Sequence, residues 1–113
     1  MLLIALIGCG CPDFSQLRVL DPEKSGLDTT VEEAVQDFQR WSGRSSVCVG
    51  EIQIQSKVLA EREDGAWAVD GTFSARERRI RLSSLDPQLR TTTLHELCHA
   101  LDRMEGISKG HPE

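Results

Sequence analysis

Between residues 29 and 43, apolar residues recur three and four positions apart, which is the spacing of one face of an α-helix. Thr30 stands at the start of this segment and Glu33 follows three residues later, a pair typical of a capping box. Gly43 ends the segment. The pattern predicts an amphipathic helix that packs against the rest of the fold through Val31, Ala34, Val35, Phe38 and Trp41.

Residues 45–59 are rich in β-branched residues and predict a strand. The alternation changes phase at Gly50, because the apolar residues occupy odd positions before it and even positions after it. A slip of one residue turns the side chains of a strand to the opposite face of a sheet. We therefore expect one continuous strand with a β-bulge near Gly50.

Two further strands and a second helix complete the pattern. Residues 67–73 and 79–82 each alternate between apolar and polar positions, which predicts half-buried strands. Asp86 as N-cap and Pro87 as first helical residue predict a last helix that ends at Gly106. This order predicts an α+β domain in which a three-stranded, mostly antiparallel sheet carries both helices on one side.

The composition of the 113-residue chain limits its organisation and its partners. An apolar fraction of 39% suffices for one modest core, and we place the domain at residues 29–113. Residues 9–28 contain proline and glycine without a sustained period and predict a linker or tether. The formal charge of −5 argues against nucleic acid as a partner. The sequence contains no apolar stretch of the roughly 20 residues that a membrane-spanning helix needs.

A short apolar run over residues 2–7 leads to Cys9. The segment Leu6-Ile7-Gly8-Cys9 resembles the lipobox of bacterial lipoproteins. The resemblance implies a signal segment over residues 1–8, membrane attachment through lipid on Cys9, and a location at the cell envelope or outside the cell. The residues leave open an alternative, which is a buried amino-terminal strand of a cytosolic domain.

The chain has four cysteines, and if Cys9 carries lipid the other three form at most one disulfide. We expect a pair between Cys48 on a predicted strand and Cys98 on the helix that packs against it. The alternative is that both are buried thiols that pack as small apolar side chains.

The strongest chemical signal is His95-Glu96-Leu97-Cys98-His99 on the last predicted helix. At about 100° per residue, His99 lies near 40° from His95 and Glu96 lies near 100°. Leu94, Leu97, Leu101 and Met104 gather on a separate face of the same wheel. Histidines that only fill a core would be mixed with these leucines. The separation favours a zinc site, with Glu96 as the general base that takes a proton from a water molecule.

This five-residue pattern, with a Thr-rich turn before it and Ala100-Leu101 behind it, resembles the zincin metallopeptidases, and most nearly the SprT-like, minimal zincin core. The resemblance implies a minimal zincin-like fold, Zn²⁺ as cofactor and hydrolysis of peptide bonds in a protein or peptide substrate. It also implies that an extended substrate pairs with the strand that bears Arg79 and Arg81.

The resemblance further implies that a histidine after a loop completes the metal site, which makes His95, His99 and His111 the ligands and Glu96 the catalytic residue. Asp102, Glu105 or a residue outside this chain remain alternatives for the third ligand. The alternative function is that of a non-catalytic or truncated zinc-binding domain of an envelope lipoprotein, in which four protein ligands would close the zinc site.

Overall fold

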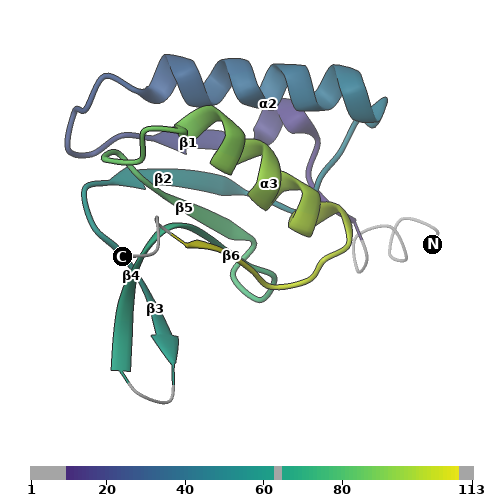
Figure 1. The fold of residues 1–113 in the computed structure, drawn as a ribbon. Coiled ribbons are helices and arrows are strands. Elements are labelled where there is room, and N and C mark those ends of the chain that lie inside the picture. Colours follow the sequence, from purple (N-terminus) through teal and green to yellow (C-terminus); the bar gives the residue numbers. More distant parts are fainter. Residues whose placement is uncertain (1–9, 63–64, 110–113) are drawn as a thin grey trace.

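This computed structural model describes residues 10–62 and 65–109, which contain two α-helices and six strands. Figure 1 shows both helices on the same side of the sheet. The fold class is α+β, as the sequence predicted. In chain order the elements are the 3-10 turn η1 (Phe14–Gln16), β1 (Arg18–Leu20), α2 (Asp28–Ser42), β2 (Glu51–Gln55), β3 (Val58–Arg62), β4 (Gly65–Ser74), β5 (Arg79–Ser83), α3 (Leu89–Leu101) and β6 (Gly106–Lys109).

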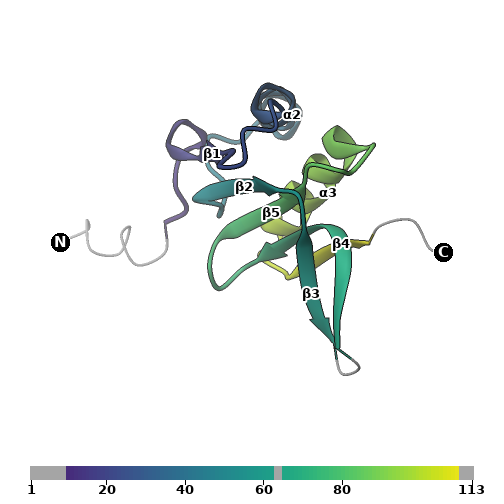
Figure 2. The same ribbon diagram turned by 90° about the vertical axis from the view of Figure 1, so that its left-hand side faces the viewer.

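The sheet is mixed rather than mostly antiparallel, and its described part has six strands where the sequence predicted three. Its order is β1-β2-β5-β4-β3. β1, β2 and β5 run parallel, whereas β4 is antiparallel to β3, β5 and β6. β5 and β6 flank the second half of β4, because Gly71 pairs with Leu82 on one edge and with Ser108 on the other. Figure 2 shows the first half of β4 extending beyond this sheet as a hairpin with β3.

The single strand predicted over residues 45–59 was wrong, because the chain forms two strands that pair with different partners. β2 lies between β1 and β5, and after Ser56 and Lys57 the chain continues as β3, which pairs with β4. The phase change at Gly50 marks the approach to β2 rather than a bulge within one strand. Gly50 donates its amide to the carbonyl of Arg78 at 2.8 Å.

The linker predicted over residues 9–28 was also wrong for much of its length. Phe14 is buried in the core, and its ring centroid lies 6.3 Å from that of Phe38. β1 pairs with β2 in parallel, so α2 is the crossover between two neighbouring strands. The predicted signal segment over residues 1–8, and Cys9 after it, lie outside the described residues.

The disulfide joins Cys11 to Cys48, with their Cα atoms 4.5 Å apart. The predicted pair of Cys48 with Cys98 was therefore wrong, and Cys98 is an exposed free thiol. The pairing follows from the fold, since residues 11–14 run beside residues 45–48. Phe14 donates its amide to the carbonyl of Ser45 at 3.0 Å.

The core fills the space between the helices and the sheet, where Val31, Phe38, Ile52, Ile80 and Leu97 are almost fully buried. α2 buries four of the five predicted residues, and its C-cap is Gly43, which has a left-handed φ of 70°. The prediction was wrong for Trp41, which is 71% exposed, and for the cap at Thr30, because the helix begins at Asp28. A Cβ atom at Gly71 would stand 2.8 Å from the methyl carbon of Thr92. The absence of a side chain at Gly71 thus lets α3, the helix that carries His95, Glu96 and His99, approach β4.

α3 is shorter at both ends than the sequence predicted. It begins at Leu89, after a turn in which the carboxylate of Asp86 accepts a hydrogen bond from the amide of Gln88. It ends at Leu101 rather than at Gly106. Arg103 adopts a left-handed φ of 55°, which turns the chain back towards β4 as β6.

Candidate metal centre

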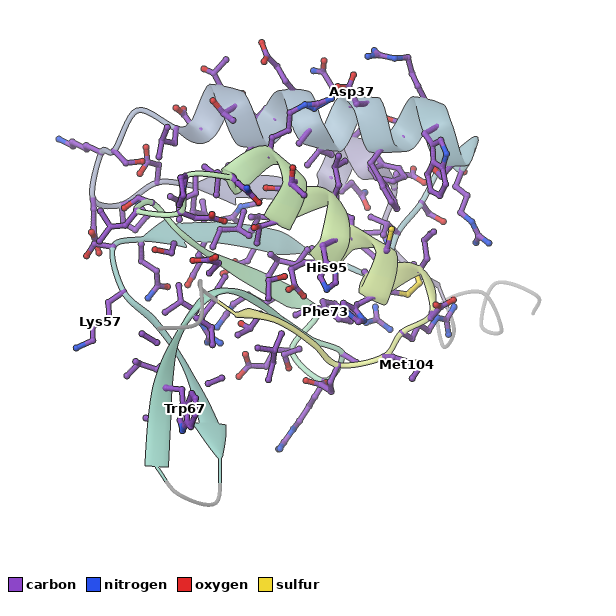
Figure 3. The ribbon with its side chains drawn as sticks, viewed as in Figure 1. Asp37, Lys57, Trp67, Phe73, His95 and Met104 are labelled. Carbon is purple, nitrogen blue, oxygen red and sulfur yellow. A yellow bond between two sulfur atoms is a disulfide. The ribbon has the colours of Figure 1, made fainter. Side chains whose placement is uncertain are left out.

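α3 presents one face to the core and an adjacent face to β6. Leu97 and Ala100 are buried against the sheet, whereas His95 is exposed and His99 half-buried. The predicted separation of the histidines from the leucine face therefore holds within the helix. Met104 does not belong to the leucine face, since it lies beyond the helix and is 62% exposed. In Figure 3 the side chain of His95 projects from α3 on the side where β6 runs.

The two imidazole rings converge on one point. The Nε2 atoms of His95 and His99 lie 3.0 Å apart, and the ring planes meet at 73°. Two nitrogens that bind one tetrahedral zinc ion at about 2.0 to 2.1 Å stand about 3.3 to 3.4 Å apart. A small rotation of either ring reaches that separation, so this pair of nitrogens fits a zinc ion.

Glu96 is fully buried, unlike His95 and His99, and its two carboxylate oxygens differ in their hydrogen bonds. Its Oε2 accepts a hydrogen bond from the hydroxyl of Ser108 in β6, whereas its buried Oε1 has no partner among the residues that the structure describes. Burial raises the pKa of the Glu96 carboxyl, and the Ser108 hydrogen bond and the charges of His95 and His99 oppose that rise. A carboxylate with a raised pKa and a free oxygen suits a general base.

Gly106, the first residue of β6, lies close to both Glu96 and His99. A Cβ atom on Gly106 would stand 2.8 Å from Oε1 of Glu96 and would overlap the ring of His99. The backbone of Gly106 is therefore packed against Glu96 and His99, at a distance that leaves no room for a side chain. The sequence had indicated Gly106 only as the end of a helix.

Ser108 was missed by the sequence reasoning. A serine in a four-residue strand belongs to no recognisable motif. The one signal was the two-residue spacing of Gly106 and Ser108, which places both on the face of β6 that meets α3.

The third ligand is not found among residues 10–62 and 65–109, where no group of three or more His, Cys, Asp and Glu side chains is placed to hold a metal ion. Glu105 accepts a hydrogen bond from the amide of Ala75 at 2.6 Å, which directs it to the β4–β5 turn. Asp102 is exposed at the carboxyl end of α3. His111 lies outside the described residues, two positions after the end of β6.

The strand expected to bind substrate was wrongly assigned. β5 carries Arg79 and Arg81, and both of its edges are filled, by β2 and by β4. The two arginines pair with carboxylates, Arg79 with Glu51 at 3.0 Å and Arg81 with Glu77 at 3.3 Å. The sheet edge next to the site is that of β4, and β6 is paired to it.

Comparison of the chain with protein-family models, with curated proteins and with solved structures gives no match. In the described residues no helix has both the length and the apolar character needed to cross a membrane.

Proposed function

We propose that this protein is a zinc-dependent metallopeptidase in which His95 and His99 hold the metal and Glu96 is the general base. The observation that carries the proposal is the convergence of two Nε2 atoms, 3.0 Å apart, beside a buried carboxylate, one oxygen of which has no partner in the described part of the chain. The proposed third ligand is His111, because β6 returns the chain past Glu96 shortly before it.

The chemistry divides between the metal and this chain's own side chains. Zinc, when bound, supplies a Lewis acid that lowers the pKa of a water molecule to about 7. Glu96 accepts the proton of the attacking water at Oε1 and transfers it to the leaving amine. Ser108 donates its hydroxyl hydrogen to Oε2 and so fixes the direction of the carboxylate.

The experiment that tests the proposal separates metal binding from hydrolysis. Purified protein is dialysed against zinc-free buffer, titrated with Zn²⁺ by calorimetry, and assayed for hydrolysis of casein. We expect His95→Ala and His99→Ala to lose most zinc affinity, and Glu96→Gln to keep zinc but lose hydrolysis. Glu33→Gln, an exposed carboxylate on α2, is the matched control and should change neither property. Casein hydrolysis by Glu96→Gln at the parent rate would refute the proposed role of Glu96.

The third ligand is tested by the same titration. His111→Ala should weaken zinc binding at least tenfold, since two imidazoles alone hold the ion in an open site. A four-ligand coordination shell, measured by X-ray absorption on the zinc-loaded protein, would instead support a structural zinc site without catalysis.

We also propose that the domain works outside the cytoplasm, at the envelope or as a secreted protein. The disulfide between Cys11 and Cys48 supports this location, because disulfides persist in oxidising compartments. The lipobox-like segment that ends at Cys9 supports lipid attachment there.

A further inference from the structure

β6 seals the carboxylate that the proposed reaction needs. Glu96 exposes none of its surface, although His95 beside it is exposed. β6 contributes to this burial at both oxygens, because Ser108 bonds to Oε2 and the backbone of Gly106 lies next to Oε1. A general base must reach the water molecule that attacks the substrate. In this arrangement neither water nor substrate has access to Glu96 from solvent.

β6 also fills the sheet edge beside the site. It pairs antiparallel with β4, with Ile107 opposite Thr72 and Ser108 opposite Gly71. These pairs occupy the backbone groups on that edge of β4 that an extended polypeptide would otherwise use. The segment that hides Glu96 therefore also occupies the nearest place where a peptide could bind as a strand.

Hydrogen bonds rather than apolar contacts hold β6 in place. Its inward residues are Gly106 and Ser108, and its outward Ile107 is 45% exposed. By contrast, β5 on the other edge of β4 buries Ile80 and Leu82 completely. A peptide that took the place of β6 would restore the hydrogen bonds to β4. Because β6 itself buries little apolar surface, its displacement also loses little apolar burial.

We propose that β6 is a displaceable cover strand that inhibits the site, and that an extended peptide gains access to Glu96 and to the edge of β4 only when β6 leaves β4. This inference rests on the proposed function and adds a mode of regulation to the same site. Ser108 is part of the cover, and its hydroxyl holds Glu96 in the closed state.

The test locks β6 to β4 with a disulfide between register partners, Thr72→Cys and Ile107→Cys. The background carries Cys98→Ser, because Cys98 is an exposed free thiol that would mispair. The matched control is a lock at another pair of register partners, Leu59→Cys and Ala68→Cys in the β3–β4 hairpin. Both proteins are measured oxidised and reduced, so any effect of opening the native disulfide is common to them.

The first measurement needs neither metal nor activity. Metal-free protein is treated with a water-soluble carbodiimide and glycine ethyl ester, and modification of Glu96 is followed by peptide mass spectrometry. We expect the oxidised Thr72–Ile107 lock to slow labelling of Glu96 at least fivefold relative to its reduced form, with no such difference in the control lock. Exposed Glu33 should label at the same rate in every sample. Equal labelling of Glu96 in the oxidised and reduced lock would overturn the proposal.

The second measurement is hydrolysis of casein by the zinc-loaded proteins. We expect the oxidised lock to be at least tenfold less active than its reduced form, and the control lock to change little. If β6 only stabilises an active site, the oxidised lock will be as active as the reduced protein, which also overturns the proposal. Absence of hydrolysis by the unlocked parent would refute the proposed function, whereas the labelling result would still decide whether β6 controls access to Glu96.

Discussion

Because Gly106 lies so close to Glu96 and His99, the substitution Gly106→Ala tests most directly whether β6 is packed against these two side chains. A Cβ atom at this position would stand 2.8 Å from Oε1 of Glu96, whereas carbon and oxygen normally approach no closer than about 3.3 Å. It would also overlap the ring of His99. Either β6 or the two side chains must therefore move by roughly 0.5 Å or more.

Two effects of this movement should be measurable. Overpacking of a buried position costs about 1 to 3 kcal/mol. For a chain of about 100 residues that cost corresponds to a fall in melting temperature of roughly 4 to 12 °C. If the ring of His99 turns away from His95, the loss of about 1.4 kcal/mol of binding free energy weakens zinc binding about tenfold.

The assay compares Gly106→Ala with Gly50→Ala, because a Cβ atom at Gly50 would meet only the carbonyl of Arg78, at 3.9 Å. Differential scanning calorimetry of the metal-free proteins gives the melting temperatures, and isothermal calorimetry gives the zinc affinities. If Gly106→Ala matched Gly50→Ala in both quantities, β6 would not be packed against Glu96 and His99 as the structure shows, which would refute the prediction.

Three further predictions concern protonation, the disulfide and lipid attachment. Because burial raises the pKa of Glu96 above its ordinary value of 4.5, the native state binds this proton more tightly than the unfolded chain does. The free energy of unfolding of the metal-free protein should therefore fall as pH rises from 4.5 through the raised pKa, and Glu96→Gln should flatten that fall in urea titrations. Cys11→Ser should lower the free energy of unfolding by about 3 to 4 kcal/mol, because the disulfide closes a loop with a sequence separation of 37, and Cys98→Ser should leave the urea midpoint nearly unchanged. A bacterial host should attach radiolabelled palmitate to the parent but not to Cys9→Ser, and equal labelling of both would refute lipid attachment at that residue.

The parts of the fold that the sequence predicted are those whose signal is local. α2 was predictable from its helical period and its terminal glycine, although it begins at Asp28, before the predicted cap at Thr30. β4 buries alternate residues over positions 69–73 and β5 over positions 79–82, so their period is visible. The histidine pair was predictable for the same reason, since four residues in a helix fix the relative direction of His95 and His99.

The parts that the sequence did not predict depend on contacts between distant segments. β1 and β6 have three and four residues, too few for a period, and the inward residues of β6 are glycine and serine rather than apolar residues. The division of residues 45–59 into β2 and β3 follows from which strands they meet, not from their own pattern. The cysteine pairing was missed because the segment around Cys11, which the fold places beside Cys48, was expected to be a tether.

The proposed ligand His111 and the proposed cover strand share one short segment, so they must affect each other. His111 follows Lys109 by two residues, and a histidine bound to zinc would anchor the carboxyl end of β6. Displacement of β6 from β4 would then have to occur as an outward bow between two fixed points, the turn after α3 and the metal.

This coupling predicts that saturating zinc slows amide hydrogen exchange at Ile107 and Ser108 in the parent. His111→Ala should show exchange at these amides that zinc does not slow, because its β6 has lost the second anchor. Exchange at β5 serves as the internal control, since β5 is held by two neighbouring strands in both proteins. If zinc slowed exchange at Ile107 equally in parent and variant, the metal would act on β6 without His111, and the third ligand would have to lie elsewhere.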